Sequence, residues 1–333
     1  MCRPATLYAA VLAVLAIIFA PAPASSAATV QDVVNQVSVT SYRDYLDNHL
    51  YTHNGNQRGF DTSGSTRHPA GQHDAARDFI SAEFGALGLA TSLDPFTFSA
   101  SGATYEGCNN VVGVKTGSVQ PNSIYIVGAH YDSLQTPGAD DNASGVAGVL
   151  EAARVLSQYQ FESTLIFIAF DAEEKGLFGS THYANSSLGS NILGMVSLDM
   201  LAYNPTGDHN NAYIYGHTSS QPIKQALANA LTDYDTGITP VIGGPLDQSD
   251  HAPFEADGWQ AVLLIEHAVW SNTKFHTSAD SVDTANYIDY TFAANMTRGT
   301  VGYLALSAGL VPEPATLLMI GAGTLILLAR RRA

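Results

Sequence analysis

Three short apolar runs of this sequence end in residues that commonly bind metal ions. His130 closes the first run, Glu173 and Glu174 follow the second, and Asp199 closes the third. Short apolar runs bounded by polar residues are typical of buried strands, and ligands of open α/β sheets bind beyond the carboxyl ends of such strands. We therefore expect these side chains to meet in one cleft, which indicates a metal site and a hydrolase.

Other residues near these runs could complete the site. Asp132 lies two residues after His130 and could hold the second ring nitrogen of a metal-bound imidazole. Asp140 and Asp141 precede a predicted helix, so either could bridge two cations or simply cap that helix. His276 offers a second imidazole from a loop. Histidine and carboxylate ligands without thiolates suit zinc, and also manganese or cobalt.

The elements that must position these residues alternate between strands and helices. This alternation predicts an α/β fold with a mixed, largely parallel sheet sandwiched between helices. The predicted strands span 110–114, 124–129, 164–170, 192–198, 212–216 and 261–265. The predicted helices span 29–50, 72–87, 144–158, 177–186 and 287–307. We expect residues 28–310 to form a single domain.

The composition excludes several classes of protein. With 333 residues, 46% hydrophobic and 13% charged, the chain is of ordinary globular type. Its formal net charge of −16 repels nucleic acid and anionic membranes, so we expect no nucleic-acid partner. Two cysteines, Cys2 and Cys108, are present, and Cys2 would leave with a signal peptide. We therefore expect no intrachain disulfide and interpret Cys108 as a small core or near-surface residue.

Both ends of the chain carry features of protein export. Residues 1–27 combine Arg3, an apolar run and small residues at a cleavage position, which predicts a signal peptide. A membrane anchor is the alternative, but the apolar run is short for a span. Residues 311–333 combine a Pro-Glu-Pro tripeptide, an apolar run and a triple arginine. This order predicts a segment that stops in the membrane, as a permanent anchor or as a sorting tail.

The order of these three parts resembles the PEP-CTERM sorting tail of exported bacterial proteins. The resemblance implies transient membrane association and cleavage by an exosortase-type processing enzyme near Pro312-Glu313-Pro314. We accordingly expect export through the inner membrane, followed by location in the cell envelope or outside the cell.

The motifs of the core resemble those of the co-catalytic zinc aminopeptidases, the bacterial leucyl aminopeptidases of peptidase clan MH. The motifs are His-Tyr-Asp-Ser, Gly-Ala-Asp-Asp-Asn-Ala-Ser-Gly, Ala-Glu-Glu-x-Gly-Leu-x-Gly-Ser, Leu-Asp-Met and His-Thr-x-x-Asp, in that order across about residues 70–305. The resemblance implies a zinc-peptidase domain with two zinc ions per chain. His130 and Asp199 would hold one ion, Glu174 and His276 the other, and Asp141 would bridge both.

The same resemblance assigns roles to residues that do not bind metal. Glu173 would be the general base, and Asp132 would orient a ligand histidine. Met200 would line the pocket for the substrate's N-terminal side chain, with Leu263 and Ile265 as further candidates.

In one segment the sequence departs from some relatives. Those relatives carry a tyrosine, as an extra donor to the oxyanion, and a local disulfide a few residues before a Ser-Asp-His tripeptide. The segment 243–251 has neither Tyr nor Cys. Its Ser249, Asp250 and His251 are either supporting groups of the site or ordinary loop residues. Glu266-His267 could touch the substrate, and the remaining histidines are interpreted as surface residues: His49, His53, His68, His73, His182, His209 and His217.

The leading functional hypothesis is an exported, monomeric zinc aminopeptidase that removes N-terminal, apolar residues from peptides. A single-zinc glutaminyl-peptide cyclotransferase of the same fold is the main alternative, and the number of bound zinc ions would separate the two. A carboxypeptidase would need basic groups for the terminal carboxylate, and few lie near the motifs. A surface adhesin or matrix protein on an inactive hydrolase scaffold is the fourth hypothesis, against which the complete ligand set argues.

Overall fold

A mixed sheet forms the centre of the structure, a computed structural model that describes residues 28–50, 57–205 and 209–312. In this part of the chain the main sheet has nine strands, and its four central neighbours, β12, β9, β6 and β8, are parallel. The strands in spatial order are β11 (Thr239–Ile242), β10 (Asn211–Tyr215), β12 (Ala261–Glu266), β9 (Asn191–Asp199), β6 (Gln120–His130), β8 (Ser163–Phe170), β5 (Ala103–Lys115) and β2 (Thr66–Arg67), with β4 (Ala90–Ala100) also paired to β5.

The central strands are continuous apolar runs because helices cover both faces of the sheet. Every residue of β8 and of β12 is buried. These are two of the strands that the sequence predicts, and the α/β fold with a largely parallel sheet is confirmed.

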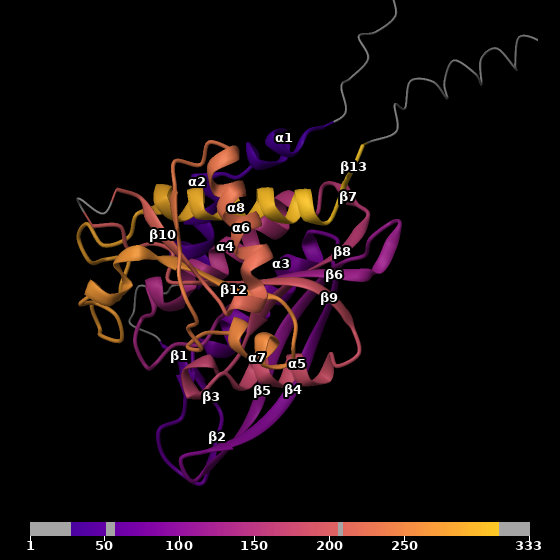
Figure 1. Ribbon diagram of the computed structural model, residues 1–333. Coiled ribbons are helices and arrows are strands. Elements are labelled where there is room, and N and C mark those ends of the chain that lie inside the picture. Colours follow the sequence, from indigo (N-terminus) through magenta and orange to yellow (C-terminus); the bar gives the residue numbers. More distant parts are fainter. Residues whose placement is uncertain (1–27, 51–56, 206–208, 313–333) are drawn as a thin grey trace, which may run out of the picture. The chain divides into compact units, whose positions relative to one another are not determined.

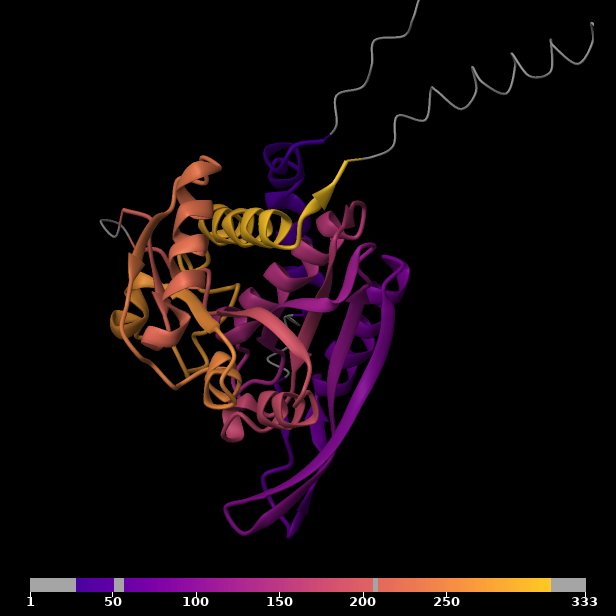
Figure 2. The same cartoon turned by 45° about the vertical axis from the view of Figure 1, so that its right-hand side comes forward.

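Helices pack on the two faces of the sheet and enclose separate apolar cores (Figures 1 and 2). The larger core lies beneath α1 (Val30–Val34), α2 (Val39–Asp44), α3 (His73–Ala86), α4 (Gly145–Leu156), α6 (Gln221–Asp233) and α8 (Tyr290–Ser307). The smaller core lies beneath α5 (Phe178–Ser186) and α7 (His251–Ala256), where Phe170 of the sheet meets Phe254. Short helical turns connect these elements: η1 (Tyr45–Leu50), η2 (Ala139–Ser144), η3 (Glu173–Lys175), η4 (Thr218–Ser220) and η5 (His267–Ser271).

Two small sheets lie outside the main one. β1 (Arg58–Phe60) pairs with β3 (Pro69–Gly71), and β7 (Gln160–Phe161) pairs with β13 (Leu310–Val311). In Figure 2 the long purple hairpin of β4 and β5 extends to the bottom of the coloured part of the chain. The sequence predicts only its last part, because β4 has no continuous apolar run, and all of its residues except Phe96 and Phe98 are exposed or half-buried.

The predicted leading helix over 29–50 is wrong. The chain forms α1, breaks, and restarts as α2, which continues into η1. The break occurs because Asn35 ends α1 and the Ser38 hydroxyl accepts a hydrogen bond from the Ser41 amide, which caps a new helix. The last helix also begins later than predicted, at Tyr290, where the Asp289 side chain caps it.

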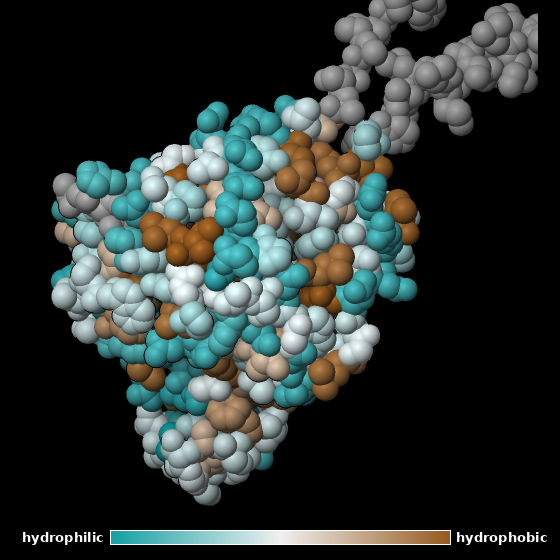
Figure 3. Space-filling model, viewed as in Figure 1, coloured by the Kyte–Doolittle hydropathy of each residue, from teal (hydrophilic) through white to brown (hydrophobic). Residues whose placement is uncertain are grey.

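The described residues from Ala28 to Pro312 form one compact unit. No helix within it is both long and apolar enough to cross a membrane. The predicted signal peptide and nearly all of the predicted tail lie outside the described residues. On the face shown in Figure 3, hydrophobic residues form small separate groups among hydrophilic ones. The single-domain division and the monomeric state stay predictions.

Candidate metal centre and active site

The three sequence-predicted strand ends meet at one edge of the sheet. β9, β6 and β8 are parallel neighbours, so their carboxyl ends lie side by side. His130 is the last residue of β6, and Asp199 is the last residue of β9. Glu173 follows β8 after a two-residue turn and begins η3. The side chains expected in one cleft are therefore brought together.

Two groups of three ligand-type residues share one carboxylate. In the first group, His130 Nε2 lies 3.3 Å from Asp141 Oδ1 and 3.6 Å from Asp199 Oδ1. In the second, His276 Nε2 lies 3.0 Å from Asp141 Oδ2 and 3.3 Å from Glu174 Oε2. Within each group the ligand atoms lie within 4.8 Å of one another. The two oxygens of Asp141 thus face two different histidines, as a bridging carboxylate must.

The chemistry of these groups fits divalent cations. Glu174 Oε1 and Asp199 Oδ1 are buried and have no hydrogen-bond partner. A buried carboxylate oxygen without a partner is costly, and a cation would compensate it. The donors are imidazoles and carboxylates without a thiolate, which suits zinc. The first group is buried, whereas the second opens to solvent through His276, whose side chain is 35% exposed.

The charges around the two histidines favour their ionised forms when no metal is bound. Burial opposes a charge on His130, but the surrounding carboxylates, led by Glu173, raise its pKa well above the ordinary value. Hydrogen bonds to Asp141 and Glu174 raise the pKa of His276 to about 10. Burial alone would raise the pKa of Asp141, yet its contacts with the two histidines lower it. A cation entering the site would replace these protons.

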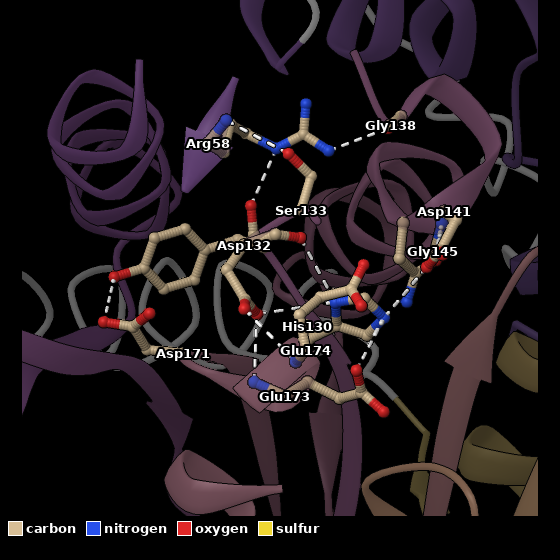
Figure 4. A network of polar contacts seen from close by, with 12 residues as sticks. Arg58, His130, Asp132, Ser133, Gly138, Asp141, Gly145, Asp171, Glu173 and Glu174 are labelled. Atoms are coloured by element: carbon tan, nitrogen blue, oxygen red, sulfur yellow. Dashed lines mark hydrogen bonds and ion pairs between the residues drawn. The ribbon is translucent and has the colours of Figure 1, made fainter. Parts of the chain in front are cut away.

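Glu173 lies beside the ligands without belonging to either group. Its Oε2 is 3.9 Å from His130 Nε2, and its side chain faces the same cleft (Figure 4). Burial raises the pKa of Glu173 well above the usual range; His130 opposes this rise and Asp199 adds to it. A carboxylate with a raised pKa accepts and returns a proton readily near neutral pH, as a general base must.

Asp132 has a wider contact set than the sequence predicts. The carboxylate accepts hydrogen bonds from the main-chain amides of Glu173 (3.1 Å) and Glu174 (3.3 Å), so it fixes the turn that carries both residues. The His130 ring is held mainly by the Asp132 main-chain carbonyl, 3.2 Å from Nδ1, while the carboxylate lies 3.5 Å away. One residue thereby positions a ligand histidine and the expected base together.

Arg58 holds the loop that joins the two ligand segments, and sequence reasoning missed it. Its buried guanidinium donates to the carbonyls of Tyr131 (2.7 Å), Pro137 (3.0 Å) and Gly138 (2.7 Å), and its amide donates to Ser133 Oγ (Figure 4). The loop runs from just after His130 to just before Asp141. No local pattern identifies Arg58, because it lies in a Gly-, Ser- and Thr-rich stretch that predicts only a loop.

The Gly-Ala-Asp-Asp segment needs its small residues for close packing. Gly138 has φ +61°, and a Cβ there would lie 2.5 Å from the Asp141 carbonyl oxygen. A Cβ on Gly145 would lie 2.3 Å from the Leu198 carbonyl oxygen. The small residues therefore let the backbone of this segment approach its neighbours closely. It also explains how Asp141 reaches the ends of two neighbouring strands.

Asp140 faces the interior, away from the ligand groups. Its carboxylate accepts from the Ala202 amide at 2.8 Å and from Asn272 Nδ2 at 3.1 Å. Burial raises its pKa to about 7. Behind it, the Asp280 carboxylate accepts the main-chain amides of Asp140 (2.7 Å) and Asp141 (3.1 Å). Of the Asp-Asp pair, only the second residue therefore joins the candidate metal centre.

An apolar pocket opens beside the ligand groups. Met200, Leu263 and Ile265 pack together with Leu246 and Val269, and all five line the hollow of about 600 Å³ that also contains the ligand groups. No Lys or Arg is among the described residues that line this hollow. The three expected pocket residues are therefore brought together next to the candidate metal centre.

The segment before α7 contains supporting groups. Ser249 is buried, and its Oγ donates to Asp199 Oδ2 at 2.8 Å, so it orients a candidate ligand. His251 is also buried, and burial lowers its pKa to about 4, which keeps it neutral. Glu266 and His267 do not line the hollow. Glu266 instead accepts the Tyr203 amide at 2.7 Å inside the core.

The interpretation of His73 as a surface residue is wrong. His73 is buried at the start of α3, and its Nε2 lies 2.7 Å from Asp171 Oδ1. Asp171 also accepts the Asn109 amide (2.9 Å) and the Tyr131 hydroxyl (3.0 Å). Because Asp171 starts the turn that leads to Glu173, this network fixes the start of the turn that carries the expected base. Cys108 is buried in the core, as the sequence predicts.

Comparisons with protein families give two matches. A model described as peptidase family M28 matches residues 110–303. A model described as the PEP-CTERM protein-sorting motif matches residues 310–333. The second motif implies processing by an exosortase and sorting to the cell surface.

The curated relatives match this chain over part of its length. A probable zinc metalloprotease of Pyrenophora teres f. teres is 41% identical over 111 residues, which are 30% of this chain and 23% of that protein. Leupeptin-inactivating enzyme 1 of Streptomyces exfoliatus is 30% identical over 247 residues, which are 67% of this chain and 53% of that protein. The matches thus span less than two thirds of the length of either relative.

Two solved structures share the fold across almost their whole length. The aminopeptidase of Aneurinibacillus sp. strain AM-1 superposes with a TM-score of 0.68 at 19% identity, covering 86% of this chain and 98% of that one. The glutaminyl cyclase of Porphyromonas gingivalis superposes with a TM-score of 0.67 at 20% identity, covering 82% of this chain and 99% of that one. At such identities the likeness establishes the α/β architecture and not the reaction.

Proposed function

This chain belongs to peptidase family M28, a family of zinc metallopeptidases, and on that premise we propose that it is an exported aminopeptidase. Its substrates would be peptides with a free amino terminus and an apolar first residue. The observation that carries the proposal is the pair of candidate ligand groups that share Asp141. Beside them lie an apolar pocket and Glu173, a carboxylate that belongs to neither group.

The proposed metal centre has two zinc ions per chain, with manganese or cobalt as substitutes. His130 and Asp199 would hold one ion, Glu174 and His276 the other, and Asp141 both. Zinc, when bound, polarises a carbonyl group and lowers the pKa of water. Two ligand groups rather than one favour a peptidase over a single-zinc cyclotransferase.

The protein side chains would supply the proton transfers. Glu173, which lies 3.9 Å from His130 and outside both groups, would take a proton from the attacking water and return it to the leaving amine. Its raised pKa suits both steps. Asp132 would keep Glu173 in place through the main-chain hydrogen bond.

The charges of the hollow support a free amino terminus as the group recognised. The described lining contains carboxylates and no Lys or Arg, so it attracts an ammonium group and offers no cationic partner to a terminal carboxylate. This argues against a carboxypeptidase. Met200, Leu263 and Ile265 would receive the first side chain, with Leu, Met or Phe preferred over Asp or Lys.

A panel of chromogenic aminoacyl substrates and their N-acetylated forms would test the proposal, with zinc content measured on the same samples. We expect cleavage of free Leu, Met and Phe derivatives and none of the acetylated ones. Preferences among apolar side chains should be graded, because an apolar pocket separates them by only about 1–3 kcal/mol. Rapid cleavage of acetylated substrates would contradict an aminopeptidase.

A glutaminyl-peptide cyclotransferase is the second candidate, favoured by the shared fold with the Porphyromonas gingivalis glutaminyl cyclase. It would bind one zinc per chain and release ammonia from peptides that begin with glutamine. One zinc per chain together with ammonia release would establish this candidate in place of the peptidase.

The proposed location follows from both ends of the chain. Residues 1–27 would be removed as a signal peptide during export through the inner membrane. The sorting tail would hold the protein at the membrane until an exosortase-type enzyme cuts it, leaving the domain in the cell envelope or outside the cell.

A further inference from the structure

Among the described residues that line the hollow, one neutral side chain, Gln248, has an amide that donates to no other described residue. Among the described lining side chains, the neutral donors are Asn272, Trp270 and Gln248. Asn272 Nδ2 lies 3.1 Å from both Asp140 Oδ2 and Glu266 Oε1, and Trp270 Nε1 lies 3.4 Å from the Tyr215 hydroxyl. Gln248 is exposed, and its side-chain amide donates to no described residue.

The residues on both sides of Gln248 have side-chain partners. Ser249 is buried and bound to Asp199 at 2.8 Å, and Asp199 is a candidate metal ligand. On the other side, the Asp247 carboxylate lies 2.8 Å from His217 Nε2. Gln248 therefore lines the hollow one residue away from a side chain that contacts the candidate metal centre.

Peptide hydrolysis at this site creates a negative charge on the carbonyl oxygen, to which a neutral donor could add a hydrogen bond. When the oxygen of water bonds to the carbonyl carbon, the electron pair of the C=O bond moves to the carbonyl oxygen. The hollow offers carboxylates, which repel this oxyanion, and no Lys or Arg. A neutral amide N–H can donate to it without competing for the metal ligands.

We propose that the side-chain amide of Gln248 donates a hydrogen bond to the oxyanion of the tetrahedral intermediate, an inference that rests on the proposed peptidase function. Glu173 holds the proton taken from water while this bond forms. When the intermediate collapses, the C–N bond breaks, the carbonyl forms again, and Glu173 gives its proton to the amine. The Gln248 bond is strongest at the charged stage, so it lowers the barrier and not the free energy of the bound substrate.

The first test compares Gln248→Ala with the wild type on a leucyl chromogenic substrate. We expect kcat to fall by about 10²-fold, the usual loss of one such donor, with KM and zinc content unchanged. Gln248→Glu should fall further, because a carboxylate would face the oxyanion. Pro245→Ala is the matched control, since Pro245 lies in the same loop, is exposed, and does not line the hollow.

A second test uses binding and needs no turnover. Calorimetry would compare the phosphonic acid analogue of leucine, which is tetrahedral and anionic, with 3-methylbutylamine, which has only the amine and the side chain. Gln248→Ala should weaken the phosphonate by the same factor as kcat and leave the amine unaffected. A change in KM alone, or equal weakening of both probes, would overturn the inference.

The two proposals fail separately. A wild-type chain that cleaves no aminoacyl substrate would contradict the peptidase function itself. An active wild type with an unaffected Gln248→Ala variant would overturn only the role of Gln248.

Discussion

At the residue scale, two adjacent glutamates have different surroundings and should have different functions. Glu174 Oε2 lies 3.3 Å from His276 Nε2 in a ligand group, whereas Glu173 lies in neither group. The main-chain amides of both glutamates donate to the two carboxylate oxygens of Asp132. The main chain of the two residues is therefore held in place, while their side chains diverge. The same separation applies to Asp140 and Asp141.

Glu173→Gln should keep its zinc and lose most of its rate. Removing a general base costs about 10²–10⁴-fold in kcat, and the glutamine amide preserves the shape of the side chain. Glu174→Gln is the matched variant and should lose zinc instead, because it removes a ligand. Kinetics and zinc analysis on the same preparations give both readouts. Near-full activity of Glu173→Gln would show that the base has been assigned wrongly.

Asp141→Asn should reduce zinc occupancy far more than Asp140→Asn. Only Asp141 faces both histidines, and the Asp140 carboxylate is taken up by Ala202 and Asn272. We expect the more exposed group, which contains His276, to lose its metal first. Zinc per chain, measured after dialysis against a weak chelator, checks this. Equal zinc content in the two variants would refute the bridging assignment.

At the scale of elements, strained turns aim the site residues. Ala172 (φ +58°) precedes Glu173, Met200 (φ +49°) follows Asp199, and His276 itself has φ +56°. Each such conformation costs roughly 1–2 kcal/mol in a residue with a Cβ, and such residues cluster at functional sites. The strands β6, β8 and β9 thus contain no residue with a positive φ angle, whereas residues at or next to the candidate ligands have positive φ angles.

The turn before Glu173 is also tied to α3, which allows a test of stability. His73→Gln should destabilise the metal-free protein by about 3 kcal/mol, because it breaks a buried charged pair with Asp171. His182→Gln is the control, since its pair with Asp94 is partly exposed and should contribute less than about 1 kcal/mol. Urea unfolding with a chelator present measures both differences.

The effect of His73 should depend on pH. Burial opposes a charge on His73, but Asp171 outweighs burial and raises its pKa above the ordinary value of 6.5. A group whose pKa is raised by folding stabilises the protein fully below its unfolded pKa, and this stabilisation is lost as pH rises through the folded pKa. The difference between wild type and His73→Gln should therefore be larger at pH 6 than at pH 9. A difference that grows with pH would contradict the ion pair.

At the scale of the whole molecule, the described unit ends with a strand that the sequence does not predict. Leu310 and Val311 form β13 and pair with β7. The sorting-motif match begins at residue 310, so this strand belongs to the compact unit and also begins the motif. A truncation that tests the tail should therefore follow Pro312.

Truncation after Pro312 should leave turnover unchanged and alter the location of the protein. The removed residues contain no candidate ligand. The full-length chain should fractionate with membranes until it is cut near the Pro-Glu-Pro tripeptide. Activity assays and mass spectrometry of the mature protein from its host would decide. A mature chain that still ends in Ala333 would mean a lasting anchor.

The sequence by itself determined the α/β fold and the cleft residues at the strand ends. Continuous apolar runs such as β8 identify buried parallel strands, and the polar residues that end them must meet, because parallel neighbours share one carboxyl edge. Apolar runs and the polar residues that end them are local patterns, so they can be recognised in the sequence alone. The roles of the individual residues, as ligands or base, stay predictions that metal analysis and kinetics must test.

Only the tertiary structure decided which residues support the site. Arg58 and His73 contact the segments that carry the candidate ligands from 80 and 98 residues away, and nothing in their local sequence marks them. Asp280 belongs to the His-Thr-x-x-Asp motif, but its contact with the Asp140 amide, 140 residues away, is visible only in the structure. Most of the hairpin of β4 and β5 was likewise missed from the sequence, because strands that are exposed on one side depend on packing and pairing with distant segments. Gln248 stands out for the same reason: a donor is recognised as free only when every potential partner around it has been placed in space.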